Sequence, residues 1–206
     1  MKGKFLTIEG GDGAGKSTNM EFICSKLATA GIDVVVTREP GGTSIGEELR
    51  ELLIKPRDQG VDPIAELLMI FAARAQHISE LIVPALERGS WVVSDRFTDA
   101  SYAYQGAGRE VGETAVSILE NLVQGELRPD MTLILDLPVD IGMERAGKRA
   151  KLDRFELEQR SFFERVRSCY LERSDSDSSR YRLIDASLPL NEVQAEIERN
   201  LNTLLP

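Results

Sequence analysis

Residues 10–17 combine glycines, a lysine and a serine in a spacing that suits phosphate binding. They read GGDGAGKS and match G-x-x-x-x-G-K-[ST] at every fixed position, after a strand-like run and before a helix-like one. Glycines permit tight turns that point backbone N–H groups inward, and these groups and the next helix N-terminus bind polyphosphate. Lys16 adds positive charge, and Ser17 can offer its hydroxyl to Mg²⁺. An incidental glycine-rich turn seldom has this context, so the pattern predicts a nucleoside triphosphate site.

Charged side chains also follow two other strand-like runs. Arg38 opens the turn REPGG after residues 32–37, and Asp95 and Arg96 follow residues 91–94. Ligands of parallel sheets bind at the carboxyl ends of strands, so these groups are expected to face the phosphate loop. Asp95 is placed to hold Mg²⁺, directly or through water, and guanidinium groups suit a phosphate. The alternatives are a surface arginine before an ordinary turn, and a helix-capping aspartate with a solvated arginine.

A basic segment at 144–154 is unusual in a chain whose net charge is −9. Its positive residues are Arg145, Lys148, Arg149, Lys151 and Arg154. Gly147 and the lack of apolar spacing predict a mobile lid, about 144–155, that closes over a polyphosphate. The alternative is a solvated helix face, which is the usual explanation of an isolated charge run.

Helix-like and strand-like segments alternate along the chain and would position these groups. Strands are predicted at 5–8, 32–37, 91–94, 131–136 and 181–184. Helices are predicted at 20–28, 43–54, from 62 onward, and at 112–124, 138–149, 156–174 and 190–204. Pro84 predicts a kink or break in the long helix that begins at residue 62, and 174–179 reads as an exposed loop.

Strands separated by helices of this length imply right-handed crossovers and a parallel sheet. The predicted fold class is therefore α/β, a P-loop NTPase with a five-stranded parallel sheet, helices on both faces and a short mobile lid. A length of 206 residues suits one such domain, 1–206.

Composition limits the partners and the compartment. An acidic chain argues against nucleic acid as the main partner. Cys24 and Cys169 are read as reduced thiols. We find no signal peptide and no apolar stretch of about 18 residues, so no membrane association and a cytoplasmic location are expected.

The inventory of charged groups favours phosphoryl transfer to a phosphate. No general base is evident, whereas a hydroxyl or water acceptor usually has a residue that orients it or takes its proton. A phosphate acceptor is already largely ionised at neutral pH and needs only alignment and charge neutralisation. A GTPase switch is the competing class, but its usual N-K-x-D motif is absent. The only histidine, His77, is read as non-catalytic.

Several motifs together resemble the thymidylate kinase family. They are IEGGDGAGKST, TREPGGT at 37–43, FAARAQH at 71–77, DRF at 95–97, SYAYQGAGR at 101–109, LDR at 152–154 and IDAS at 184–187. They follow the family order over nearly the whole chain. The resemblance implies transfer of the ATP γ-phosphate to dTMP to give dTDP, for dTTP biosynthesis, with Mg²⁺ as cofactor and a homodimeric enzyme.

The resemblance also implies roles for individual residues. The implied ATP-binding residues are Gly10, Gly11, Asp12, Gly13, Ala14, Gly15, Lys16, Ser17 and Thr18. The implied dTMP-binding residues are Asp12, Arg38, Pro40, Phe71, Arg74, Arg96, Ser101 and Gln105. The implied catalytic residues are Lys16, Asp95, Arg96, Arg149 and Arg154, with Ser17 and Asp95 at the metal.

In detail, Arg38 and Arg96 would grip the dTMP phosphate and Asp12 would reach the 3′-hydroxyl. Phe71, which alone reads as a core residue, would stack on thymine, and Arg74 would hydrogen-bond the base. Pro40 would follow a cis peptide.

Two departures from the family pattern matter. The variable loop positions 11–14 carry no cation, so the lid is expected to supply one, with Arg149 the best match and Arg154 the second. Phe97 stands where many members have Tyr. A preference for dTMP over dUMP rests on resemblance alone. The alternatives are a deoxynucleoside kinase of the same fold and a P-loop ATPase or regulatory protein without transfer.

Overall fold

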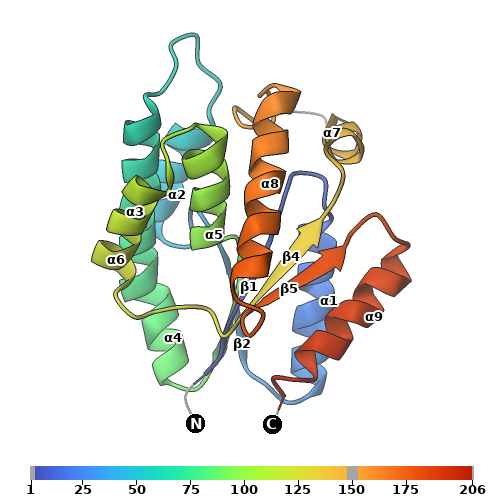
Figure 1. The fold of residues 1–206 in the computed structure, drawn as a ribbon. Coiled ribbons are helices and arrows are strands. Elements are labelled where there is room, and N and C mark those ends of the chain that lie inside the picture. The colour runs from blue at the N-terminus through green and yellow to red at the C-terminus, as the bar shows by residue number, and fades with distance from the viewer. Residues whose placement is uncertain (1–2, 148–152, 206) are drawn as a thin grey trace.

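One parallel sheet organises the computed structural model, which describes residues 3–147 and 153–205. Its strands are β1 (Phe5–Gly10), β2 (Val34–Arg38), β3 (Trp91–Asp95), β4 (Met131–Asp136) and β5 (Tyr181–Asp185), in the order β2-β3-β1-β4-β5 (Figure 1). Every neighbouring pair is parallel. The predicted five-stranded parallel sheet is confirmed, and β1, whose carboxyl end opens into the phosphate loop, lies at its centre.

Helices cover both faces of the sheet (Figure 1). Helices α1 (Lys16–Thr29) and α9 (Leu190–Leu201) pack on one face, where Leu6 and Ile8 of β1 contribute to the core. The opposite face is covered by α3 (Pro63–His77), α4 (Val83–Glu87) and α8 (Arg160–Ser176). The other helices are α2 (Ser44–Ile54), α5 (Thr98–Ser101), α6 (Glu113–Gln124) and α7 (Val139–Gly147). Successive side chains of a strand point to opposite faces, so Glu9 lies on the α8 side.

The sequence predicts a kink or a break at Pro84, and the long helix does not break there. It continues from Pro63 to Glu87, with a π-helical turn, η1 (Ile78–Ile82), immediately before α4. The π turn shifts the hydrogen-bond pattern ahead of the proline, which has no N–H to donate.

By length and composition this helix could cross a membrane, whereas no such stretch was expected. However, Glu66, Arg74 and His77, at most 1 % exposed, lie along it and contact other elements of the fold. This fits the core helix of a folded domain.

A second π-helical segment, η2 (Tyr102–Gly108), was not predicted. It follows α5 and packs closely against α8, where a Cβ on Gly108 would lie 2.6 Å from the Phe162 ring. Because Gly106 and Gly108 have no side chains, this stretch of the sequence lacks the apolar spacing that would predict a helix. Helix α8 runs to Ser176, so part of the predicted loop at 174–179 is helical.

Candidate active site

The glycine-rich loop between β1 and α1 adopts the predicted strand–loop–helix arrangement. Gly13 and Gly15 have φ of 79° and 84°, a left-handed conformation that favours glycine. A Cβ on Gly10 would clash with the Leu135 carbonyl of β4, and one on Gly13 with the Gly142 carbonyl of α7. The loop therefore lies between β4 and the helix that leads into the predicted lid.

Lys16 is buried in the first turn of α1 and folds back onto the loop. Its Nζ donates to the carbonyls of Gly10 at 3.2 Å and Gly11 at 3.3 Å. Burial lowers the pKa of Lys16, as does the nearby Arg96 guanidinium, while neighbouring carboxylates oppose the shift. The two backbone carbonyls that accept from this ammonium group are neutral. A bound phosphate would place a negative charge beside it.

Arg96 is directed at the loop by an unusual backbone conformation, with φ of 68°. Its Nη2 donates to Asp12 Oδ1 at 2.8 Å and to the Tyr104 hydroxyl at 2.9 Å, and its Nη1 donates to the Gly10 carbonyl at 3.0 Å. Tyr104 also donates to Asp12 Oδ2 at 3.1 Å. The structure thus brings Arg96 and Asp12 together, and it adds Tyr104, which lies in the SYAYQGAGR motif but was not singled out.

A buried glutamate supports the turn at Arg96. Glu9 Oε1 accepts from the Phe97 N–H at 2.7 Å, and its Oε2 accepts from the Tyr170 hydroxyl at 2.8 Å. Tyr170 in turn lies 3.3 Å from Arg96 Nη1. Burial, then the charge of Asp99, raises the pKa of Glu9 to about 8. Sequence reasoning missed Glu9 and Tyr170, because only folding brings these distant positions together.

Asp95 and Ser17 fit the chemistry of a magnesium site. Asp95 ends β3 beside β1, and its Oδ1 is buried without a hydrogen-bond partner among the described residues. Ser17 is exposed at the start of α1. A hard cation prefers oxygen ligands such as a carboxylate and a hydroxyl, and Mg²⁺ usually adds waters and substrate phosphates.

Two arginines lie at the turn after β2, Arg38 at the end of the strand and Arg50 on α2. Arg38 is exposed and pairs with Glu47 at 2.9 Å, and the Glu39–Pro40 peptide is cis, as predicted. Arg50 of α2 donates to the Pro40 carbonyl at 3.0 Å. Burial, then the Arg38 charge, lowers the pKa of Arg50. Sequence analysis did not identify Arg50. The apolar spacing of residues 43–54 predicts a helix, but it does not predict which residues the polar face of that helix contacts.

Arg74 is 1 % exposed, and hydrogen bonds fix its guanidinium. Its Nε donates to Glu39 Oε2 at 2.7 Å, and its Nη2 donates to Ser101 Oγ at 2.9 Å and to the Phe97 carbonyl at 3.1 Å. Its Nη1 is buried and has no hydrogen-bond partner in the part of the chain that the structure describes. A buried donor without a partner is costly, so this nitrogen is available for a ligand oxygen.

One cavity of about 420 Å³ joins these groups. Residues of both predicted subsites line it, among them Lys16, Ser17, Arg38, Arg74, Asp95 and Arg96. Ser101 and Gln105 also line it. The phosphate loop and the arginines of the second subsite therefore open into the same space.

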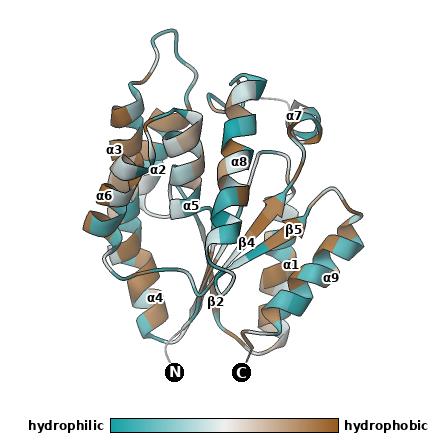
Figure 2. Cartoon of the chain, in the orientation of Figure 1, coloured by the Kyte–Doolittle hydropathy of each residue, from teal (hydrophilic) through white to brown (hydrophobic). Residues whose placement is uncertain are grey.

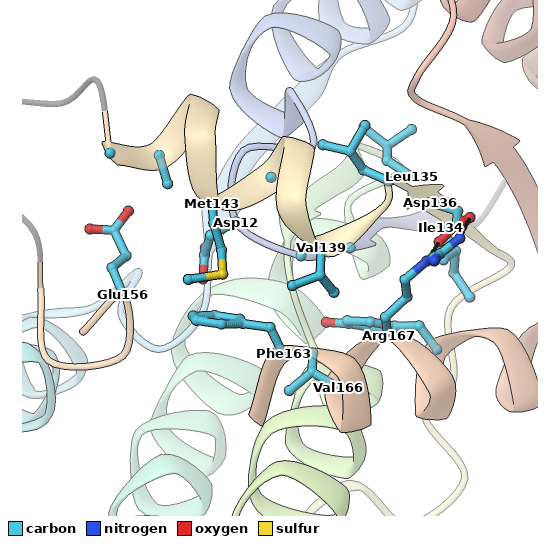
Figure 3. Close-up of a pocket in the computed structure, with 17 residues that line it drawn as sticks. Asp12, Ile134, Leu135, Asp136, Val139, Met143, Glu156, Phe163, Val166 and Arg167 are labelled. Atoms are coloured by element: carbon cyan, nitrogen blue, oxygen red, sulfur yellow. Dashed lines mark hydrogen bonds and ion pairs between the residues drawn. The ribbon is translucent and has the colours of Figure 1, made fainter. Parts of the chain in front are cut away.

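A smaller, mostly apolar cavity of about 140 Å³ lies between α7 and α8, next to Asp12. In Figure 3, Val139 and Met143 of α7 lie close to Phe163 of α8, and an ion pair joins Arg167 to Asp136 beyond them. This cavity leaves apolar space beneath the helix that leads into the predicted lid.

A sequence model of the Thymidylate kinase family matches residues 8–197. The chain belongs to the thymidylate kinase family. A thymidylate kinase of Teredinibacter turnerae is 56 % identical over 205 residues, which cover 100 % of both chains. Another, from Pseudomonas savastanoi pv. phaseolicola, is 55 % identical over 206 residues, covering 100 % of this chain and 96 % of that one.

A solved structure of thymidylate kinase from Ehrlichia chaffeensis has the same fold. Its TM-score is 0.79 at 32 % identity, covering 98 % of this chain and 99 % of that one. The family resemblance inferred from the motifs is thus confirmed, and so is the nucleoside monophosphate kinase type of fold.

The family resemblance placed Phe71 against a base, but the structure argues against that placement. Phe71 is 2 % exposed and packs in the core with Leu67 and Tyr102. The Arg74 guanidinium lies 4.4 Å from its ring centroid. Ile70, one residue earlier, lines the large cavity instead. One residue turns a helix by about 100°, so the motif alone did not distinguish the two positions.

Arg154, the second candidate for the lid cation, is held by the body of the protein. Its Nη2 donates to Glu66 Oε2 at 2.6 Å and its Nε to the Leu53 carbonyl at 2.8 Å. Glu66, which is 0 % exposed, also accepts from Gln105 at 2.8 Å. Arg154 is therefore already paired, which makes it a weaker candidate for a mobile cation. Arg149, the first candidate, lies outside the described residues.

Proposed function

We propose that this chain transfers the γ-phosphoryl group of ATP to dTMP, giving dTDP and ADP. The observation that carries the proposal is the buried Nη1 of Arg74, a donor without a partner that belongs to a residue lining the same cavity as the phosphate loop. A carbonyl oxygen of a pyrimidine base would satisfy it. An ATPase that only hydrolyses its nucleotide needs no such second subsite.

On the donor side, the amides of loop residues 10–18 and the Lys16 ammonium hold the ATP phosphates. Ser17 and Asp95 would hold Mg²⁺, in line with the buried Oδ1 of Asp95, which has no hydrogen-bond partner among the described residues. When bound, the ion neutralises charge that develops on the phosphate oxygens.

On the acceptor side, Arg38 and Arg96 hold the dTMP phosphate and Asp12 accepts from the 3′-hydroxyl. To do so, Arg96 exchanges its hydrogen bond with Asp12 for one with the phosphate. Arg74, Ser101 and Gln105 surround the base beside Pro40. Ile70 rather than Phe71 supplies an apolar contact in this arrangement.

The chemistry is in-line transfer by alignment and charge neutralisation. The acceptor phosphate is ionised at neutral pH, since its second pKa is about 6, so no side chain must remove a proton. Arg149 supplies the cation that the phosphate loop lacks, from a lid at about 144–155 that closes over the donor. Water is then excluded from the transferring group.

We also place the enzyme in the cytoplasm as a homodimer. Helices α3 and α6 lie side by side (Figure 1) and expose Ile64, Leu68, Ile118 and Leu122. Figure 2 shows hydrophobic residues along both helices. An apolar surface of this kind suits a second copy of the chain, because neighbouring exposed apolar side chains mark interaction surfaces.

The experiment is a coupled ADP-release assay with ATP and Mg²⁺ and a panel of nucleosides and nucleoside monophosphates. The proposal expects ADP release with dTMP and none with thymidine. Release with thymidine alone would instead indicate a deoxynucleoside kinase. Release that needs no acceptor would indicate an ATPase.

A further inference from the structure

His77, the only histidine in the chain, lies in a buried network behind Arg74. The Glu39 carboxylate joins the two residues, because its Oε2 accepts from Arg74 Nε at 2.7 Å and its Oε1 lies 2.9 Å from His77 Nδ1. The other ring nitrogen, Nε2, lies 2.7 Å from the Thr37 hydroxyl. His77 is 0 % exposed and Glu39 4 %, so solvent does not compete for these bonds.

The carboxylate partner of the imidazole places a proton on one of its nitrogens. An ionised carboxylate only accepts hydrogen bonds, so Nδ1 carries the proton that Glu39 accepts. In a neutral imidazole Nε2 is then an acceptor, and the Thr37 hydroxyl can donate to it. In this arrangement Glu39 and Arg74 balance each other's charge, and His77 uses both of its ring nitrogens.

The turn after β2 packs against the imidazole and leaves it little room. Gly42 has φ of 81°, and a Cβ on it would lie 2.5 Å from Thr37 Oγ1 and 2.6 Å from His77 Nε2. The ring, which projects from the end of α3, is thus packed against the turn at Gly42. It can fix the Glu39 carboxylate in one orientation.

We propose that His77 is a positioning residue for recognition of the acceptor base. It acts through Glu39, whose orientation sets the plane of the Arg74 guanidinium and so the direction of its unpartnered Nη1. The inference rests on the proposed function, in which Nη1 donates to a base carbonyl. It goes further by assigning His77, Glu39 and Thr37 to the discrimination of a carbonyl from an amino group on the acceptor pyrimidine.

The test compares His77→Leu with His77→Gln. Leucine removes both hydrogen bonds, whereas the glutamine amide can donate to Glu39 and accept from Thr37. Loss of a bond to a buried charged group costs about 1–3 kcal/mol. For His77→Leu we therefore expect the KM for dTMP to rise by about 5- to 100-fold. The KM for ATP should stay within about twofold, and the preference for dTMP over dCMP in kcat/KM should fall. His77→Gln should restore most of both losses.

A matched control is Gln76→Ala, which changes the preceding residue of the same helix, whose amide bonds to Glu80 at the surface. Should His77→Leu fail to fold, Thr37→Val removes only the hydroxyl and should give a smaller change in the same direction. The inference is overturned if the foldable variant keeps the wild-type KM for dTMP and base preference, or loses ATP and dTMP binding equally. A wild-type protein without dTMP kinase activity would instead refute the proposed function itself.

Discussion

At the residue scale, the site depends on groups whose charges are controlled by burial. Glu9 shows this best, because its carboxyl group is 0 % exposed and bonds to both the Phe97 N–H and the Tyr170 hydroxyl beside Arg96. Its position at the carboxyl end of the central strand lets one side chain support the acceptor arginine from behind. Such a group should reveal itself in the pH dependence of stability.

Glu9→Gln should remove a pH dependence of the folded state. The pKa of Glu9 rises from 4.5 to about 8 on folding, so between these values the native state binds a proton that the unfolded state has released. The free energy of unfolding therefore falls as the pH rises through this window, by at most about 1.4 kcal/mol per unit. Urea denaturation from about pH 5 to about pH 9 should show E9Q gaining stability relative to wild type up to about pH 8 and no further. A difference that stays constant with pH would contradict the assignment.

Substitutions of Ile70 and Phe71 should distinguish a residue that binds dTMP from one that packs in the core. Ile70→Ala should raise the KM for dTMP with little change in the KM for ATP, because Ile70 lines the cavity. Phe71→Leu should mainly lower the melting temperature, because its ring is buried in the core. Steady-state kinetics and thermal denaturation of both variants test this. The reverse pattern would restore the stacking role of Phe71.

Arg149→Ala tests the lid cation. Removing a positive group that stabilises the transition state should lower kcat by about 10²- to 10⁴-fold. Arg182→Ala, a loss of equal charge at a surface site whose guanidinium bonds to the Ser178 carbonyl, serves as the control. Near-normal turnover of R149A would transfer the role to Lys148 or Arg154.

At the element scale, η2 supplies Tyr104 and Gln105 to the large cavity and packs closely on α8. Gly108→Ala would place a methyl group against the Phe162 ring and should cost about 1–3 kcal/mol of stability. Gly60→Ala is the matched control, since a Cβ there meets nothing within 4 Å. Chemical denaturation of the two variants measures the contrast. Equal stabilities would show that the ring moves aside at no cost.

The features that could be predicted from the sequence are those encoded by residues close together in the chain. The phosphate loop, the strand-end residues Arg38 and Asp95, and the cis Pro40 follow from spacing or from a family motif. By contrast, Glu9 and Tyr170 are 161 positions apart, and only the fold brings them together. The choice between Ile70 and Phe71 depends on helix rotation by one residue, which a motif does not specify.

At the scale of the whole molecule, the chain lines one cavity with both basic and acidic side chains and exposes an apolar face elsewhere. If α3 and α6 form the dimer interface, Leu122→Glu should shift the protein toward monomer, since Leu122 is 77 % exposed on that face. Analytical ultracentrifugation measures the mass, with Ser178→Glu in an exposed turn as the charge-matched control. A dimer unaffected by L122E would place the interface elsewhere.

The central claim is that both substrates meet in the 420 Å³ cavity and that phosphate passes directly between them. The most direct measurement follows a radiolabelled ATP γ-phosphate in the presence of Mg²⁺ and dTMP, with the products separated by chromatography. The label should be recovered in dTDP, and omission of dTMP should leave it in ATP. Label recovered mainly as inorganic phosphate, at the same rate with and without dTMP, would contradict the claim.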